Sequence, residues 1–214
     1  MEHLYEFWPV PVGVKQFSDS EVTLLNQELR QDIITITQTE EPETRSGIGV
    51  WQSGLFKNSY TSFDKLAELI QPVAFKFMVQ SGYHQDAMKH YSISSFWINC
   101  NDDSQGYHIP HIHGTGDVDW TGIYYPAGGQ ELDIKSTNYP DAGDLVLHDP
   151  NGHMKHMVNP PDRTELYPYY GLPMTIKPQE SLMIIFPTWV VHSVAPKGNT
   201  PKTRMSIGFN VEKK

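Results

Sequence analysis

Eight short runs rich in β-branched and aromatic residues follow one another from about Ile93 to Asn210. Glycine, proline, asparagine and aspartate separate the runs, and these residues favour turns. Runs of this length with turn signals between them are typical of antiparallel strands. The pattern therefore predicts a mostly β fold with two sheets, either a sandwich or a double-sheet barrel. The runs read ISSFWIN, TGIYY, ELDIK, DLVLH, MTIKP, SLMIIF, VVHSV and RMSIGFN.

Two helices are predicted before the strands, over residues 18–33 and 62–81. Ser18 and Glu21 have the spacing of a capping box at the start of the first helix. Pro72 is expected to kink or split the second helix. Each helix has an apolar stripe at helical spacing, which is typical of a face that covers a core. The stripes are Val22, Leu25, Leu29 and Ile33 in the first, and Leu66, Leu69, Ile70, Val73 and Phe77 in the second.

The length of 214 residues suits a single domain. We expect residues 1–92 to form an extended N-terminal segment with supporting helices, and residues 93–214 to form the β core. No apolar run approaches the roughly 18 residues that span a bilayer, so no membrane association is expected. Because the chain has one cysteine, Cys100, and shows no export signal, we expect a cytoplasmic protein.

A formal net charge of -9 bears on the class of partner. Nucleic-acid binding relies on clustered Lys and Arg, and here these residues are scattered. We therefore expect a small molecule or a peptide as partner and no nucleic acid. One segment, residues 149–170, is long, rich in Pro and Asn and without periodicity, and we expect a loop there. Such a loop is either a binding segment or a surface insertion.

Three of the ten histidines have the arrangement that a metal site needs. His111 and His113 are two residues apart, so on an extended strand both imidazoles project to the same face. His192 follows an apolar strand and can supply a third ligand from elsewhere in the fold. Three ligands on one face leave open positions for a bidentate cosubstrate and dioxygen. The alternative is that these imidazoles only form hydrogen bonds with backbone groups, and His108 nearby adds a further candidate.

A carboxylate-binding set is predicted from the last strand. Arg204 and Ser206 point to the same face of RMSIGFN and present a guanidinium beside a hydroxyl. An arginine fork binds a carboxylate through two parallel hydrogen bonds. Tyr125, at the end of TGIYY, can add a phenolic donor. Taken alone, Arg204 favours an ion pair with an acidic residue at a strand edge, and the order of the motifs as a set is what favours the carboxylate-binding role.

Taken in order, these motifs resemble the Fe(II)/2-oxoglutarate oxygenase superfamily, in particular its small microbial and phage branch related to prolyl hydroxylases. The resemblance covers about Phe96 to Asn210, and the opening EFWPVPVGV is similar to the N-terminal segment of that family. It implies a double-stranded β-helix core of the jelly-roll or cupin-like type. The matching pieces are FWIN, HIHG, TGIYYP, LVLHDP, FPTWVVHSV and RMSIGFN.

The resemblance implies that His111 and His192 bind iron. It also implies that Arg204, assisted by Ser206 and Tyr125, binds the distal carboxylate of 2-oxoglutarate. At the second ligand this chain departs from the commoner His-x-Asp or His-x-Glu pattern, because His113 stands at that position. We favour His113 as the second ligand. The carboxylates that compete with it are Asp117, Asp119 and Asp149.

The implied activity is a dioxygenase reaction, a hydroxylation for example, that couples oxidative decarboxylation of 2-oxoglutarate to oxidation of a second substrate. A prolyl or other peptidyl side chain is the substrate that the resemblance suggests. Two alternatives are a cupin-like metalloenzyme that does not use 2-oxoglutarate, and a structural β-sandwich. An Arg204 side chain that points into the metal pocket favours the use of 2-oxoglutarate, whereas one that faces solvent favours the cupin-like alternative. Four aromatic residues are candidates to line the active-site cavity, namely Trp97, Trp120, Tyr124 and Trp189.

Overall fold

The structure is a computed structural model. It describes residues 10–43, 45–56, 60–101, 105–114, 117–128, 134–136, 140–150, 173–196 and 204–214.

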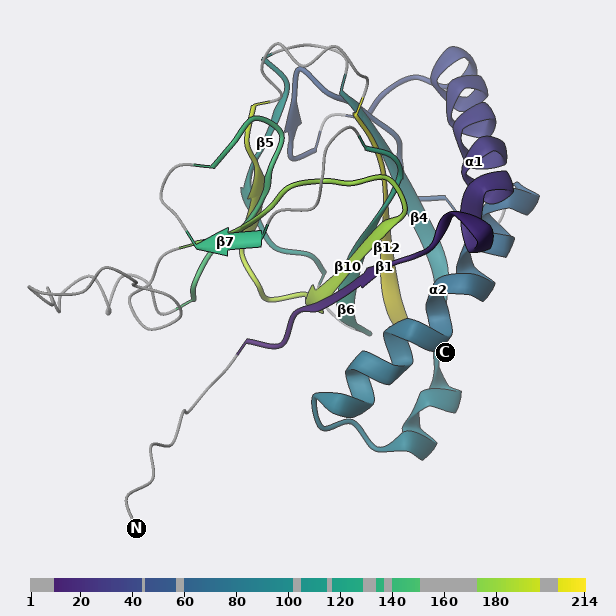
Figure 1. Ribbon diagram of the computed structural model, residues 1–214, viewed down its shortest axis with the longest axis vertical. Helices are drawn as coiled ribbons and strands as arrows, with labels where there is room; N and C mark the ends of the chain where they lie inside the picture. Colours follow the sequence, from purple (N-terminus) through teal and green to yellow (C-terminus); the bar gives the residue numbers. More distant parts are fainter. Residues whose placement is uncertain are drawn as a thin grey trace, which may run out of the picture.

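Two six-stranded antiparallel sheets form the core, which confirms the predicted mostly β, double-stranded β-helix fold (Figure 1). The first sheet has the order β1-β10-β6-β12-β4-β3 and the second the order β2-β5-β11-β8-β9-β7. The strands of the first sheet are β1 (Gly13–Gln16), β3 (Trp51–Gln52), β4 (Tyr91–Asn101), β6 (Val118–Ala127), β10 (Leu182–Pro187) and β12 (Arg204–Lys213). Those of the second are β2 (Gly47–Ile48), β5 (Tyr107–His111), β7 (Ile134–Ser136), β8 (Leu145–Leu147), β9 (Met174–Ile176) and β11 (His192–Val194).

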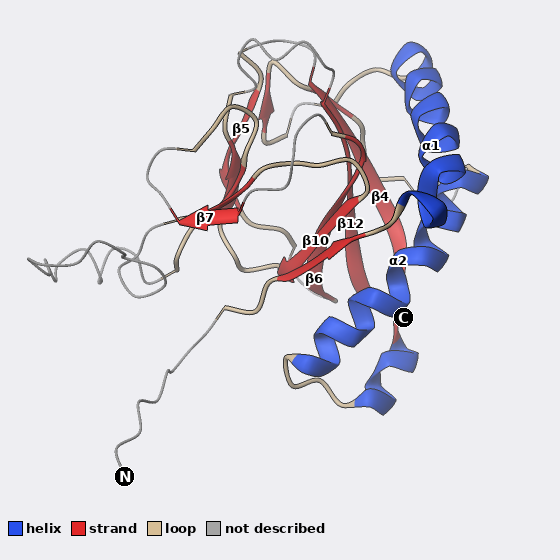
Figure 2. Cartoon of the chain, viewed as in Figure 1, coloured by secondary structure: helices blue, strands red, loops and turns tan. Residues whose placement is uncertain are grey.

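Helices α1 (Asp19–Thr39) and α2 (Thr61–Gln80) lie together on the outer face of the first sheet (Figure 2). A short 3-10 helix, η1 (Gln85–His90), leads from α2 into β4. The predicted apolar stripes turn toward the sheet, because Val22, Leu29 and Ile33 of α1 and Leu66 and Ile70 of α2 are buried. The helices therefore cover one face of the first sheet and leave its other face to the second sheet.

Strand alternation divides the first sheet into two different surfaces. On β10, Met183 and Ile185 join the core beneath the helices, whereas Ile184 and Phe186 join the core between the sheets. Residues two apart on a strand share a face, so neighbours of opposite parity must face opposite cores. The polar side chains of β4, β6 and β12 that face inward thus meet the second sheet.

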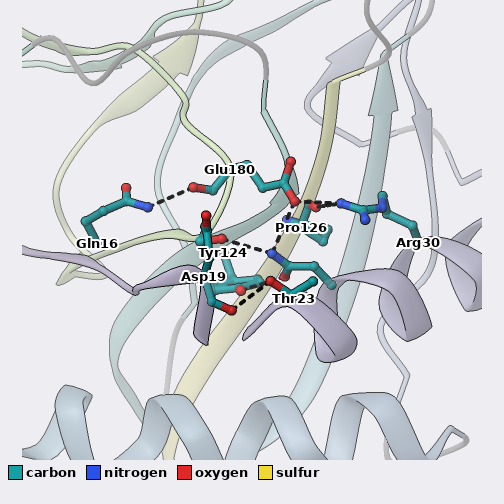
Figure 3. Close-up of polar contacts among 9 residues, drawn as sticks. Gln16, Asp19, Thr23, Arg30, Tyr124, Pro126 and Glu180 are labelled. Atoms are coloured by element: carbon teal, nitrogen blue, oxygen red, sulfur yellow. Dashed lines mark hydrogen bonds and ion pairs between the residues drawn. The ribbon is translucent and has the colours of Figure 1, made fainter. Parts of the chain in front are cut away.

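Helix α1 is joined to β6 and to the residues before β10 by a buried polar network, part of which is drawn in Figure 3. Asn26, which is 1% exposed, donates from Nδ2 to Ser181 Oγ at 2.9 Å and accepts at Oδ1 from the Tyr124 hydroxyl at 2.7 Å. Arg30 adds bonds to the Pro126 carbonyl and to Glu180, each under 3 Å. These contacts set how α1 lies against the strands that carry the interior face.

Several local predictions can be compared with the structure. Ser18 begins α1 as expected, and its N–H donates to Glu21 Oε2 at 2.8 Å. The helix extends beyond the predicted end at residue 33 to Thr39, because Ile36 is also buried against the core. Pro72 does not split the second helix, which is continuous from residue 61 to 80.

Four strands were not predicted, namely β1, β2, β3 and β5. Three of them have four residues or fewer, and strands this short carry little periodic signal. Residues 151–172, most of the predicted loop, lie outside the described residues. Within the described part of the chain, neither α1 nor α2 has the length and apolar character needed to cross a membrane.

Replacing Asn26 with alanine tests the network that joins α1 to the sheet. The change leaves the Tyr124 hydroxyl and the Ser181 hydroxyl without their buried partner, so we expect the free energy of unfolding to fall by about 1–3 kcal/mol. Urea denaturation measures this loss. The matched control is Leu24→Ala on the same helix, because Leu24 is 74% exposed and its replacement should change stability by at most about 0.5 kcal/mol. Equal stability of the two variants would contradict this account.

Candidate metal centre

Three histidines meet where β5 pairs with β11. His111 is the last residue of β5 and lies directly opposite His192, the first residue of β11, in the antiparallel register. His113 follows two residues after β5, and its backbone N–H donates to the Thr188 carbonyl at 3.1 Å. This bond holds the segment after β5 against the turn that precedes β11. One ligand atom from each of the three imidazoles lies within 4.8 Å of the others.

Backbone carbonyls orient two of the rings. His111 Nδ1 lies 2.7 Å from the Ile109 carbonyl, and His192 Nδ1 lies 3.0 Å from the Val190 carbonyl. Because a carbonyl can only accept, each Nδ1 carries the proton and each Nε2 keeps a free lone pair. A hydrogen bond from the ring nitrogen that does not bind the metal is the usual way in which a protein fixes the tautomer of a metal-binding histidine.

His113 Nε2 and His192 Nε2 lie 3.0 Å apart. Two nitrogens bound at right angles to one metal are separated by about 3 Å when each bond is about 2.1 Å long. The observed distance therefore suits two lone pairs that converge on one cation. The third ring lies beside them, with its centroid 4.3 Å from that of His192 and 5.1 Å from that of His113.

Burial keeps these imidazoles neutral. Desolvation and the neighbouring histidines lower the pKa of His113 to about 3 and that of His192 to about 4. Burial also lowers the pKa of His111. Since a metal binds the neutral form of imidazole, the site offers three ligands that need not lose a proton at neutral pH.

None of the competing carboxylates joins this cluster among the described residues. Asp119 Oδ2 instead accepts a 2.5 Å hydrogen bond from the Tyr91 hydroxyl. The structure thus brings together the three histidines named from the sequence, and it leaves Asp117, Asp119 and Asp149 outside the group.

Arg204 begins β12 and turns into the interior, where it is 6% exposed. Its Nη2 donates to the Tyr125 hydroxyl at 3.1 Å, and its guanidinium carbon lies 5.1 Å from the centroid of the Tyr125 ring. Its Nε is buried and has no partner among the described residues. A buried donor without a partner indicates a place where a ligand can complete the hydrogen bonding. The structure therefore joins Arg204 to Tyr125, as the sequence suggested.

Ser206 shares the inward face of β12 with Arg204 and is 2% exposed. Its hydroxyl lies opposite Asn99 of β4, whose Nδ2 donates to Ser206 Oγ at 3.4 Å. Asn99 was not among the residues named from the sequence. The alternation of FWIN in β4 places it on the same face as Trp97, and this was the signal available.

The four candidate aromatic residues divide between two faces. The Trp97 ring stacks on the His113 ring, with centroids 5.0 Å apart and an angle of 30°. Trp189 follows Thr188 at the turn beside the cluster and is 52% exposed. The expectation for Trp120 and Tyr124 was wrong, since both lie in the core beneath the helices. The physical reason is strand parity, because Tyr125 faces inward and its neighbour Tyr124 must face outward.

Comparison with solved structures shows the fold. The chain is similar to a Pseudomonas putida prolyl-4-hydroxylase, with 11% identity, coverage of 96% of this chain and 94% of that chain, and a TM-score of 0.63. It is also similar to a Trichoplax adhaerens prolyl hydroxylase in complex with a hypoxia inducible factor peptide, with 14% identity, coverage of 95% and 84%, and a TM-score of 0.57. The epimerase SnoN from nogalamycin biosynthesis, described as non-heme and alpha ketoglutarate dependent, has 12% identity, coverage of 95% and 78%, and a TM-score of 0.57.

Comparison of the sequence gives the family. No curated protein sequence matches the chain. Residues 95–210 match the model of a family of 2OG-Fe(II) oxygenases. The matched segment runs from β4 to β12 and includes the three histidines, Tyr125, Arg204 and Ser206. Because this match spans more than half of the chain, the protein belongs to the family of 2-oxoglutarate- and Fe(II)-dependent oxygenases.

Proposed function

We propose that His111, His113 and His192 hold the iron of this oxygenase, and that Arg204, with Tyr125 and Ser206, holds the distal carboxylate of 2-oxoglutarate. The convergence of three neutral imidazoles beside a buried arginine is the observation that carries this proposal. When bound, the iron and cosubstrate supply oxidative decarboxylation of 2-oxoglutarate coupled to oxidation of a second substrate. The protein supplies orientation and a shielded environment for that chemistry.

The ligand set fits iron in its donor chemistry and its arrangement. Imidazole nitrogen is a common ligand for iron, and three ligands on one side leave the other positions open. His111 and His192 come from neighbouring strands whose backbone pairing fixes their spacing, and the bond from the His113 N–H to the Thr188 carbonyl positions the third ring. His111 and His192 are held by carbonyls at Nδ1, so Nε2 is the nitrogen that each presents.

Arg204 fits a carboxylate better than it fits a structural ion pair. The alternative interpretation, a partner acid at a strand edge, requires an Asp or Glu beside the guanidinium. Among the described residues the contact found is the Tyr125 hydroxyl instead. A buried guanidinium strongly attracts an anion, and two of its N–H groups can bind both oxygens of one carboxylate.

The inward orientation of Arg204 also bears on the cupin-like alternative. A metalloenzyme that does not use 2-oxoglutarate has no need for a buried cation near its metal. Here the guanidinium is close enough to the histidines for its charge to contribute to the lowered pKa of His108. A buried cation on the inner face supports a cosubstrate that carries a carboxylate.

A peptidyl side chain, such as a prolyl ring, is the substrate class we propose. Two large apolar residues next to the metal-binding histidines support it, since Ile112 is 55% exposed and Trp189 is 52% exposed. An exposed Trp face can pack against an aliphatic ring. We propose as well that residues 1–214 act as one oxygenase domain, because the Pseudomonas putida enzyme aligns with 96% of the chain.

Substitution of the second ligand tests the metal centre. Removing the imidazole in His113→Ala leaves two ligands, so we expect the protein to bind iron at least about 10-fold more weakly. Asp117→Asn and Asp119→Asn should retain parental iron affinity, because neither carboxylate belongs to the cluster. Anaerobic equilibrium dialysis with Fe(II) measures all three. Loss of iron in an aspartate variant together with retention in His113→Ala would assign the ligand to the carboxylate.

Substitution of Arg204 tests the cosubstrate role. We expect 2-oxoglutarate to produce a weak visible charge-transfer band on anaerobic titration of the Fe(II)-loaded parent. In Arg204→Ala the affinity obtained from this titration should fall by about 100-fold or more, because hydrogen bonds to a charged group are lost. Arg30→Ala is the matched control, since Arg30 binds Glu180 on the outer side of the sheet. An iron-loaded parent that gives no band would favour the cupin-like alternative.

A further inference from the structure

The three rings of the histidine cluster are not held in the same way. Backbone carbonyls orient His111 and His192 at Nδ1. Within the described part of the chain no carbonyl does this for His113, whose ring contacts the other imidazoles and the indole of Trp97. The backbone bond from His113 to Thr188 does not set the direction of the ring, because it leaves the side chain free to rotate. The His113 ring therefore needs another support.

The indole of Trp97 supplies a flat surface for this ring. The two ring centroids are 5.0 Å apart and the interplanar angle is 30°, which is a stacked arrangement within the favourable range of about 4.5–7 Å. Trp97 belongs to β4 of the first sheet, whereas His113 follows β5 of the second. The contact therefore joins the third ring of the cluster to the sheet that also carries Arg204.

A glycine makes room for the indole. Gly208 of β12 is the direct cross-strand partner of Trp97. A Cβ at this position would lie 2.5 Å from Trp97 Nε1 and closer still to Cε2 and Cζ2, so any other residue would push the indole away from β12. Glycine inside a strand weakens the strand and often marks a place where another group approaches the backbone closely. Here the approaching group is the ring that stacks on His113.

Metal binding strengthens a contact of this kind. An imidazole that binds a cation takes on part of the positive charge. The face of an aromatic ring attracts positive charge, and indole does so most strongly among the side chains. Trp97 thus favours the metal-bound state of His113 in addition to orienting its ring. A carboxylate at residue 113 would gain nothing from the same face, because the face of the ring is negative.

We infer that Trp97 is a positioning residue for the second metal ligand: its indole, admitted by Gly208, holds the His113 imidazole toward the other two histidines. The inference rests on the proposed function. It also accounts for the departure from a carboxylate at this ligand, because a histidine has a ring face that can be supported and a carboxylate has none.

Iron affinity tests this role without turnover. Trp97→Leu keeps an apolar side chain and removes the flat ring, and we expect it to bind Fe(II) about 5- to 10-fold more weakly in anaerobic equilibrium dialysis. Trp97→Phe restores a ring, so its affinity should return to within about 2-fold of the parent. Trp189→Leu is the matched control and should retain parental affinity, because Trp189 lies beside the cluster with 52% of its surface exposed.

A second background separates positioning from general packing. In His113→Asp the ring that Trp97 supports is absent, so adding Trp97→Leu should change iron affinity by less than about 2-fold. A tryptophan that only stabilises the fold would cause the same loss in both backgrounds. Equal losses, or a Trp97→Leu protein within about 2-fold of the parent, would overturn the inference. If His113→Asp binds no iron, recovery in Trp97→Phe supports the inference and lack of recovery overturns it.

Gly208→Ala decides if Trp97→Leu does not fold. Its Cβ displaces the indole, so we expect the same loss of about 5- to 10-fold, and parental affinity would overturn the inference. A parent that binds no iron contradicts the proposed function itself. A parent that binds iron, with Trp97→Leu unchanged, contradicts only the role of Trp97. The two failures are therefore distinguished within one set of measurements.

Discussion

The antiparallel pairing of β5 with β11 is the interaction on which the rest of the site depends. It places His111 directly opposite His192, and the hydrogen bond from His113 to Thr188 adds the third ring to the same place. Backbone pairing sets these distances, so no long side chain has to lose rotamer freedom to form the site. The carbonyls of residues 109 and 190 then orient two of the rings. A metal site built this way is organised before its ion arrives.

The second requirement is that the two faces of the first sheet pack against different surroundings. The outer face of the first sheet packs against α1 and α2 through aromatic and aliphatic residues, and the inner face carries Arg204, Ser206 and Asn99. Burying these polar groups costs free energy unless ligands or neighbours satisfy them. The apolar core under the helices offsets this cost, because it anchors the same strands. The polar network around Asn26 joins α1 to the outer side of this sheet.

The proposed ligand set has an electrostatic consequence. Three neutral imidazoles leave the full charge of the metal ion uncompensated, whereas the commoner set with one carboxylate cancels part of it. An anionic cosubstrate then meets two positive groups, the iron at one end and Arg204 at the other.

The sequence by itself determined the strand-rich second half and both helices, because periodicity is a local property. The order of its motifs also named three histidines that the structure brings together, and the pair Arg204 and Tyr125 that it joins. It did not determine which aromatic residues face the site, since Trp120 and Tyr124 lie on the outer face and Trp97 on the inner one. Nor did it identify Asn99, which lies opposite Ser206 on the inner face. Only the tertiary structure decided these points, because strand register and sheet packing bring together side chains whose separation along the chain carries no signal.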